Sequence, residues 1–254
     1  MRTICVTGAA GGIGSATCAR LEKDGHRVVG VDIRDAEVIA DLSTPDGRAA
    51  MIDDVTRACD GVLDGLVAGA GLMGTEARVA AVNYFGAVAT LSGLRPLLAR
   101  GSEPSAIAIS SNSTTVTPNI PGDLVDGFLD GDEPSALAAL EGREFFAYMA
   151  SKLALAWWVR RNAVTADWIG AGIRLNAIAP GVIETPMTAK DLDFIMSIPD
   201  TFPVPIGRPG RPEEIASFLT FLLSPDASFF CGSVLFVDGG SDAALRPNDY
   251  PSSL

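Results

Sequence analysis

The feature that most constrains this chain is a glycine-rich turn between a short apolar segment and a helical one. Residues Arg2–Thr7 are predicted to form a strand, and Ser15–Asp24 favours a helix that ends at Gly25. The turn between them contains Gly8, Gly11, Gly12 and Gly14. Glycine permits a tight turn and lets backbone N–H groups approach a pyrophosphate at the start of a helix. Because a second strand, Arg27–Asp32, follows, the region is predicted to be a βαβ nucleotide-binding unit.

The residue that ends this second strand predicts which cofactor binds. Asp32 lies 18 residues beyond Gly14, close to the spacing of about 20 at which an acid binds the ribose 2′-hydroxyl of NAD. A carboxylate there repels the 2′-phosphate of NADP, so we predict NAD or NADH and place NADP second. Arg34 is a weak signal in the opposite direction.

Composition limits the classes of protein to which the chain belongs. Its 254 residues, 48% hydrophobic and 20% charged, suit one large α/β domain with a sizeable core. A net charge of −12 opposes binding to nucleic acid or to anionic membranes. The four cysteines form no C-x-x-C pair and His26 is the single histidine, so we expect no metal site. With no signal-peptide pattern and no apolar run approaching ~18 residues, a soluble cytoplasmic protein is expected.

Strands and helices alternate along the rest of the chain. Strands are predicted at Glu37–Ala40, Leu63–Ala68, Ser105–Ser110, Ile173–Ala179 and Ser233–Val237. Helices are predicted at Pro45–Cys59, Glu76–Arg100, Phe145–Ile169 and Pro212–Leu223, with Pro96 as a possible kink or end of the second. The pattern predicts an α/β fold, a parallel sheet with helices on both faces, as a single domain over residues 1–254. The tail Leu245–Leu254 is expected to be irregular or an edge contact.

A tyrosine and a lysine lie four residues apart in the helix predicted at Phe145–Ile169. This spacing places Tyr148 and Lys152 on one helix face. A neighbouring cation favours phenolate over phenol, so the pKa of Tyr148 is predicted to fall from about 10 toward a range useful for proton exchange. The alternative is that the two side chains merely share an exposed face.

Topology brings further groups toward this pair. Ser111 follows one predicted strand and Pro180-Gly181 follow another, and the helix with Tyr148 and Lys152 runs between these strands. Ligands of such sheets bind outside the carboxyl ends of the strands. A hydroxyl donor, a phenol and a cation near a nicotinamide suit the interconversion of a carbonyl and an alcohol.

The order of these motifs resembles the short-chain dehydrogenase/reductase family over essentially the whole chain. The matching residues are Thr7-Gly8-x₃-Gly12-x-Gly14, Asp32, Asp41-Leu42, Ala70-Gly71, Asn83, Ser111, Tyr148-x₃-Lys152, Pro180-Gly181-x₃-Thr185 and Asp238-Gly239-Gly240. The resemblance implies a Rossmann fold with a seven-stranded parallel sheet in the order 3-2-1-4-5-6-7. It also implies subunits that pair, as a homodimer or homotetramer.

The resemblance also implies a role for each matching site residue. Tyr148 would be the acid/base, Ser111 would orient and polarise the substrate, Lys152 would bind the nicotinamide ribose and lower the pKa of Tyr148, and Asn83 would hold a proton-relay water. The implied cofactor-binding residues, with Tyr148 and Lys152, are Gly8, Gly11, Gly12, Ile13, Gly14, Asp32, Ile33, Asp41, Leu42, Ala70, Gly71, Pro180, Gly181, Ile183 and Thr185, the last two at the carboxamide. By themselves, the residues leave Asn83 as a polar group satisfied in a helix and do not distinguish Ser110 from Ser111.

Two departures from the family pattern change what is expected. Ala68-Gly69-Ala70-Gly71 stands where the family commonly has Asn-Asn-Ala-Gly, so asparagine side-chain contacts there are lost. Ser111 and Tyr148 are 37 residues apart, where the family usually has about a dozen, because of an insertion at residues 117–142. It is rich in Pro, Gly and Asp and contains a short helical piece, Pro134–Glu141. We expect it to cover or rebuild the surface through which the family pairs its long helices.

Within the family, three segments resemble the bacterial 3α-hydroxysteroid dehydrogenase/carbonyl reductase group: Gly30–Thr44, Val82–Gly86 and the insertion. Residues 182–208 are expected to form a substrate lid. Its apolar side chains either line a pocket or simply pack the lid onto the body: Met187, Phe194, Ile195, Met196, Ile198 and Phe202.

The leading hypothesis is an NAD(H)-dependent oxidoreductase that interconverts a secondary alcohol and a ketone or aldehyde, with a 3α-hydroxysteroid as one candidate small-molecule substrate. A broad carbonyl or quinone reductase and a hydroxyacyl or sugar-alcohol dehydrogenase are the alternatives among enzymes. From other classes, a non-catalytic NAD-sensing regulator and a structural interaction protein are retained. The complete set of Ser111, Tyr148 and Lys152 opposes the sensor, because a sensor needs no proton chemistry.

Overall fold

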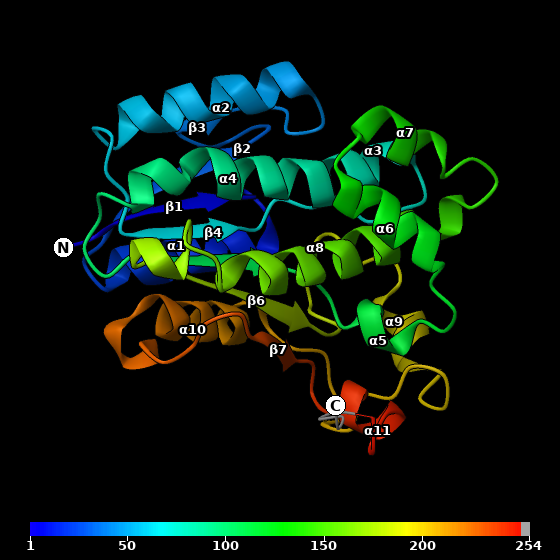
Figure 1. The fold of residues 1–254 in the computed structure, drawn as a ribbon. Helices are drawn as coiled ribbons and strands as arrows, with labels where there is room; N and C mark the ends of the chain where they lie inside the picture. Colours follow the sequence, from blue (N-terminus) through cyan, green and yellow to red (C-terminus); the bar gives the residue numbers. More distant parts are fainter. Residues whose placement is uncertain (250–254) are drawn as a thin grey trace.

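A parallel sheet of seven strands lies at the centre of the computed structural model, which describes residues 1–249 (Figure 1). Its strands run in the order β3-β2-β1-β4-β5-β6-β7, and every neighbouring pair is parallel. They span β1 Thr3–Thr7, β2 Arg27–Asp32, β3 Val38–Ile39, β4 Gly65–Ala68, β5 Ser105–Ile109, β6 Arg174–Pro180 and β7 Val234–Val237. The predicted fold, including the strand order implied by the family, is confirmed.

The central strands are buried along their whole length. Every residue of β4, β5 and β6 is buried, whereas the edge strand β7 is only partly covered. Continuous apolar runs are typical of parallel strands with helices on both faces. Because these strands are short and mostly apolar, their positions were predicted to within about two residues.

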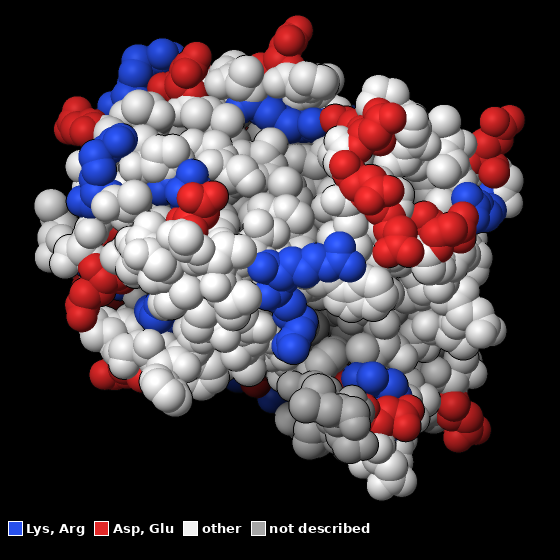
Figure 2. Space-filling view, in the orientation of Figure 1, with Lys and Arg blue, Asp and Glu red and all other residues white. Residues whose placement is uncertain are grey.

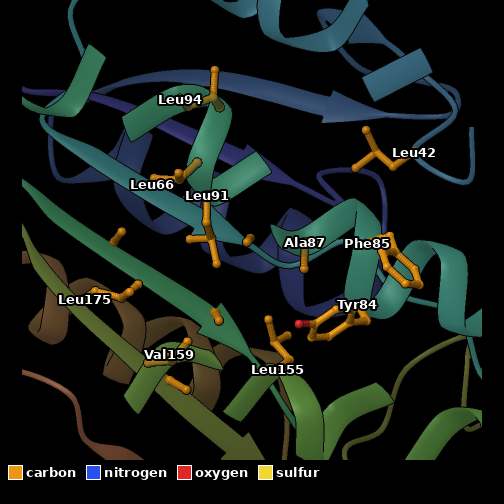
Figure 3. Packing of buried hydrophobic residues seen from close by; sticks show 14 of the residues in the cluster. Leu42, Leu66, Tyr84, Phe85, Ala87, Leu91, Leu94, Leu155, Val159 and Leu175 are labelled. Carbon is orange, nitrogen blue, oxygen red and sulfur yellow. The ribbon is translucent and has the colours of Figure 1, made fainter. Parts of the chain in front are cut away.

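Helices cover both faces of the sheet, and successive residues of β1 show the alternation. Ile4 and Val6 point into a cluster with α1 (Gly12–Lys23) and α10 (Pro212–Leu223). Cys5 points into the larger cluster on the other face, with α2 (Pro45–Ala58), α4 (Ala87–Leu98) and α8 (Ala147–Ala163). Figure 3 shows this second cluster, in which leucines of β4 and β6 contact leucine and valine side chains of α4 and α8.

The long helix predicted at Glu76–Arg100 is divided into three parts. A short α3 (Ala77–Ala80) leads into η1, a π-helix over Ala81–Gly86, and then into α4. Pro96 lies inside α4, which ends two residues later at Leu98. π-Helical turns are rare and often occur at functional sites, and this one contains Asn83.

The helix predicted at Phe145–Ile169 is shorter than expected. A 3₁₀ turn, η2 (Glu144–Phe146), precedes α8, and α8 ends at Ala163. Thr165 bonds back to the carbonyl of Asn162 through both its N–H and its hydroxyl, which turns the chain. This turn lets Trp168, 3% exposed, pack edge-on against Trp158 before the 3₁₀ turn η3 (Ile169–Ala171). Tertiary packing of one tryptophan therefore ends the helix early.

The insertion at residues 117–142 is helical and packed onto the body. It contains α6 (Gly122–Asp130), which was not predicted, and α7 (Glu133–Ala138), which replaces the predicted helix Pro134–Glu141. Leu124, Val125 and Phe128 are buried, and α6 packs against α8 (Figure 1).

Short helices complete the chain beyond these elements. They are α5 (Ser113–Val116), α9 (Leu192–Met196), the 3₁₀ turn η4 (Pro225–Ala227) and α11 (Ser241–Leu245). The part of the predicted tail at residues 250–254 lies outside the described residues. Among residues 1–249, no helix has the length and apolar character needed to cross a membrane.

Candidate active site

The glycine-rich turn packs so closely at Gly8 and Gly14 that a side chain at either position would overlap the backbone. Gly8 has φ +78° and its N–H donates to the carbonyl of Val31, which ties the turn to β2. A methyl group at Gly14 would lie 1.9 Å from the carbonyl oxygen of Gly8, well inside van der Waals contact. We call residues 8–14 the glycine cradle. It leaves the N-terminus of α1 open to an anionic group.

Asp32 lies at the end of β2, beside this cradle. Its carboxylate accepts hydrogen bonds from the N–H groups of Ala10, at 3.0 Å, and Ile33, at 2.7 Å. The N–H of Ala40 donates to the carbonyl of Asp32, so the chain after β3 lies next to it. Hydrogen bonds from Ser43 then hold the pKa of the Asp41 carboxyl below its usual range.

A cavity of about 430 Å³ extends along the carboxyl ends of the strands. Every residue that the sequence predicts for the cofactor and catalytic sites lines it, except Asn83. The cavity also has walls that the sequence analysis missed, among them Leu72, Met73, Arg78 and Thr188. Leu72 and Met73 directly follow the matched Ala70-Gly71, so their position in the chain could have predicted that they line the cavity.

Ser111 and Tyr148 both line this cavity. The side chain of Ser111 interacts with the Tyr148 phenol and lowers its pKa, and the Ser111 oxygen accepts the N–H of Ser113 at 3.1 Å. The neighbouring Ser110 hydroxyl instead donates to the backbone carbonyl of Lys152 at 2.9 Å. The geometry therefore distinguishes two serines that the local sequence could not distinguish. The side chain of Ser111 interacts with the Tyr148 phenol, and Ser110 links the end of β5 to α8 by a hydrogen bond.

The pKa of Tyr148 differs from the prediction. Burial raises it above its ordinary value, and the hydrogen bond from Ser111 offsets this only in part. The ammonium of Lys152 lies 5.9 Å from the centroid of the Tyr148 ring. Lys152 does not produce the lowered pKa expected for Tyr148, because desolvation of the phenolate dominates.

Lys152 is itself a buried cation. It is 4% exposed, and its Nζ donates to the carbonyl oxygen of Ile109 at 2.7 Å. Burial lowers its pKa from 10.5 to about 8. A lysine with this pKa changes charge within the pH range in which many enzymes work.

Asn83 lies behind the cavity wall. It is fully buried, and its side-chain amide makes two hydrogen bonds with the backbone of Leu72: Oδ1 accepts from the N–H at 2.8 Å and Nδ2 donates to the carbonyl at 2.9 Å. A methyl group placed on Gly71 would lie 3.2 Å from Asn83 Oδ1 and 3.4 Å from Lys152 Nζ. The asparagine side chain therefore holds the segment that separates it from Lys152.

Residues 182–208 border the cavity through Ile183, Thr185, Pro186, Met187 and Thr188. They are joined to the body where Ile183 pairs with Gly210 and where Ile206 N–H bonds the carbonyl of Gly239. Of the six apolar side chains named for this segment, only Met187 lines the cavity. Phe194 is 64% exposed. Among residues 1–249, no group of His, Cys, Asp or Glu residues is placed to hold a metal ion.

Family models match most of the chain. One, described as short chain dehydrogenase, matches residues 2–120, and another, described as Enoyl-(Acyl carrier protein) reductase, matches residues 135–242. The gap between them lies within the insertion, as expected for a segment that ordinary members lack.

Individual relatives are similar over nearly the whole chain. The chain is 43% identical to 3-alpha-hydroxysteroid dehydrogenase/carbonyl reductase of Comamonas testosteroni, over 98% of its own length and 100% of the relative's. It is 34% identical to cis-4-hydroxycyclohexanecarboxylate dehydrogenase of Sinomonas cyclohexanicum, over 95% and 97% of the two chains. The crystal structure of 3-alpha-hydroxysteroid dehydrogenase from Pseudomonas sp. B-0831 complexed with NADH matches with a TM-score of 0.89 at 42% identity, covering 97% and 99% of the chains. The protein is therefore a member of the short-chain dehydrogenase/reductase family of oxidoreductases.

Proposed function

We propose that the protein interconverts a secondary alcohol and a ketone with NAD or NADH as cofactor. The observation that supports this most is the contact between Ser111 and Tyr148, beside the buried cation of Lys152, in a cavity whose other end is the glycine cradle. A proton donor and a dinucleotide-sized site in one cavity suit carbonyl reduction. The similar Pseudomonas enzyme is described as complexed with NADH.

The residues present fit a dinucleotide. The cradle has no room for a side chain at Gly8 or Gly14, and it exposes the first turn of α1 to a pyrophosphate. Asp32, beside it, accepts hydrogen bonds and carries the charge that disfavours a 2′-phosphate. When bound, the cofactor accepts or donates the hydride.

Asp32→Ala tests this assignment. Loss of the carboxylate removes a repulsion worth about 1.4 kcal/mol or more, so the preference for NAD over NADP should fall at least about tenfold. An unchanged ratio of kcat/KM for the two cofactors would exclude Asp32 as the 2′-hydroxyl ligand.

The catalytic roles follow from the same geometry. With substrate bound, the Ser111 O–H turns from Tyr148 to donate to the substrate oxygen, while the Ser111 oxygen still accepts the N–H of Ser113. Tyr148 gives its proton to the carbonyl oxygen in reduction and takes the hydroxyl proton in oxidation. Because burial raises its pKa, it is protonated near neutral pH and ready for reduction. Lys152 binds the nicotinamide ribose, and Asn83 holds a water of the proton relay.

We propose a cyclic, largely apolar substrate, with a 3α-hydroxysteroid as the first candidate. The cavity that contains Tyr148 is also lined by Leu72, Met73 and Met187, which suits an apolar ring system. The names of the Comamonas and Pseudomonas enzymes specify such a steroid. The Comamonas name also includes carbonyl reductase, so a broad carbonyl reductase is the second candidate.

A carbonyl panel separates these possibilities. NADH oxidation is followed with 3-ketosteroids, cyclic ketones, quinones and aldehydes, with Tyr148→Phe as the inactive control. Turnover of the steroid alone supports the first candidate, and turnover of many carbonyls supports the second. Tight NADH binding without turnover of any carbonyl would favour the non-catalytic sensor.

We also propose that the protein is a homo-oligomer in which the insertion covers part of the surface used for pairing in the family. Support comes from α6, whose residues Leu124, Val125 and Phe128 are buried against the body beside α8. Light scattering combined with proteolysis tests this: an ordinary tetramer with a protease-sensitive insertion would contradict it.

A further inference from the structure

The insertion at residues 117–142 has a charge composition unlike that of the rest of the chain. It contains six acidic residues and no lysine or arginine, and Figure 2 shows acidic side chains gathered over α6 and α7. Most of these carboxylates point to solvent. Glu133, the first residue of α7, instead has only 19% of its side chain exposed. A largely buried carboxylate needs a specific partner.

That partner is Arg48 of α2. Arg48 Nη1 and Nη2 donate to the two carboxylate oxygens of Glu133 at 2.6 and 2.5 Å, a bidentate pair. The side chain of Arg48 is 9% exposed. Such a shielded pair keeps its geometry better than a surface ion pair does, since neither side chain is free in solvent.

The other edge of the same guanidinium holds a wall of the cofactor cavity. Arg48 Nε donates to the carbonyl oxygen of Leu42 at 2.9 Å, and Nη2 donates to that of Ser43 at 3.3 Å. Leu42 and its neighbour Asp41 both line the cavity. Since Ala40 is hydrogen-bonded to Asp32, this turn lies at the end of the cavity assigned to adenosine.

The turn at Asp41–Ser43 has little freedom to move independently of α2. A methyl group on Gly47 would lie 2.0 Å from the carbonyl oxygen of Asp41, so the turn is pressed against the first turn of α2, where Arg48 also lies. The Arg48 guanidinium adds to this packing, because its two hydrogen bonds hold the carbonyl groups of Leu42 and Ser43 in place.

We infer that Glu133 is a positioning residue for the cofactor. Its carboxylate orients Arg48, and Arg48 fixes the turn that forms the adenosine wall of the cavity. The inference rests on the proposed binding of NAD. The insertion ends six residues before Tyr148 in the chain, yet the inference gives it a role at the adenosine end of the site: docking of the insertion tightens cofactor binding.

The test compares Glu133→Ala with Asp123→Asn, titrating each with NADH by fluorescence. Asp123 is the matched control, since it is also an insertion carboxylate paired with an arginine, Arg143, at 2.6 Å but away from the cavity. If the turn is correctly placed only one tenth of the time without Glu133, the Kd for NADH rises about tenfold. Asp123→Asn should leave it unchanged.

Further ligands and kinetics separate positioning from a general loss of structure. Glu133→Ala should weaken ADP-ribose as much as NADH, and reduced nicotinamide mononucleotide, which has no adenosine, not at all. KM for NADH should rise with kcat reduced less than twofold, and Glu133→Gln, which keeps an acceptor, should be intermediate. If Glu133→Ala does not fold, Glu133→Gln alone tests the inference: it should weaken NADH and ADP-ribose and leave reduced nicotinamide mononucleotide unchanged.

Two results would overturn the inference, and they differ from failure of the proposed function. Equal NADH affinity in the wild type and the Glu133 variants excludes it, and so does an equal loss for all three ligands. Absence of carbonyl turnover with intact NADH binding rejects the proposed chemistry and leaves this inference standing. Absence of NADH binding by the wild type rejects both.

Discussion

The glycine cradle lines the cofactor cavity, whereas the insertion reaches the cavity wall through Arg48, and the two are held in place by different forces. The cradle is held by backbone contacts so close that a single methyl group on Gly14 would overlap the carbonyl of Gly8. The insertion is held by side chains: Phe128 in its core and the ion pair of Glu133 with Arg48 at its edge. Contacts made by the backbone leave a short, local sequence pattern, whereas contacts made by side chains are distributed over distant segments.

The largest effect is expected from a test of whether side-chain packing holds the insertion on the body. Phe128 is fully buried, with its ring centroid 5.6 Å from that of Tyr84 and 6.0 Å from that of Phe85, both in η1. Phe128→Ala should lower the free energy of unfolding by about 3–5 kcal/mol, as is usual for a buried phenylalanine. Denaturant unfolding measures this. A loss below about 1 kcal/mol would show that the insertion is not part of the cooperative core.

The next largest effect is expected from the buried ammonium of Lys152, which lowers the stability of the folded protein. The pKa of Lys152 is about 8 in the folded protein against 10.5 unfolded. The unfolded chain therefore binds more protons between these values, so this lysine's destabilising contribution is full below pH 8 and is lost as the pH rises to 10.5. A shift of this size is worth roughly 3 kcal/mol.

Lys152→Met isolates that contribution. The variant should be more stable than the wild type at pH 7, and the difference should shrink toward pH 10. Thermal unfolding of both proteins across this range measures it. A difference independent of pH would mean that the ammonium is better solvated than its burial indicates.

A substitution at Gly14 tests whether close backbone contacts hold the glycine cradle in place. Gly14→Ala places Cβ 1.9 Å from the carbonyl oxygen of Gly8, so the turn and the start of α1 must separate. We expect NADH affinity to fall about 100-fold, equivalent to about 2.8 kcal/mol. Fluorescence titration measures the loss, and circular dichroism shows whether the sheet remains. Affinity within threefold of the wild type would mean that the cradle is more adaptable than its packing suggests.

The same contrast explains how much could be predicted from the sequence. The parallel sheet and the juxtaposition of Ser111 with Tyr148 at the carboxyl ends of its strands follow from local motifs on short buried strands, whereas the strand order was implied only by the resemblance to the family. The helix α6 was missed because Pro121, Gly122 and Gly127 are typical of a loop. Its apolar face, Leu124, Val125 and Phe128, has helical spacing, but only packing against the body stabilises it.

Two features of the site depended on contacts that no local pattern specifies. The π-helix η1 occurs where the buried Asn83 side chain bonds the backbone of Leu72, eleven residues earlier. The pKa of Tyr148 was predicted from Lys152 alone, yet burial by the surrounding fold moves it in the opposite direction. Burial is a property of the assembled structure, so charge arguments from spacing omit its larger effect.

The smallest effect is expected from the same glycine-to-alanine substitution made in the insertion, at Gly127. Gly127 lies inside α6, with no atom within 4 Å of an added methyl group and without a positive φ. Gly127→Ala should therefore stabilise the protein by about 0.5–1 kcal/mol, because alanine loses less backbone freedom than glycine on forming a helix. Denaturant unfolding measures the gain, and NADH affinity should be unchanged. The same substitution that disrupts the cradle at Gly14 should thus improve the insertion, since one glycine fills a space that a side chain cannot enter and the other only weakens a helix. A destabilising Gly127→Ala would show that α6 is more tightly packed than its contacts indicate and would remove the distinction between the two regions.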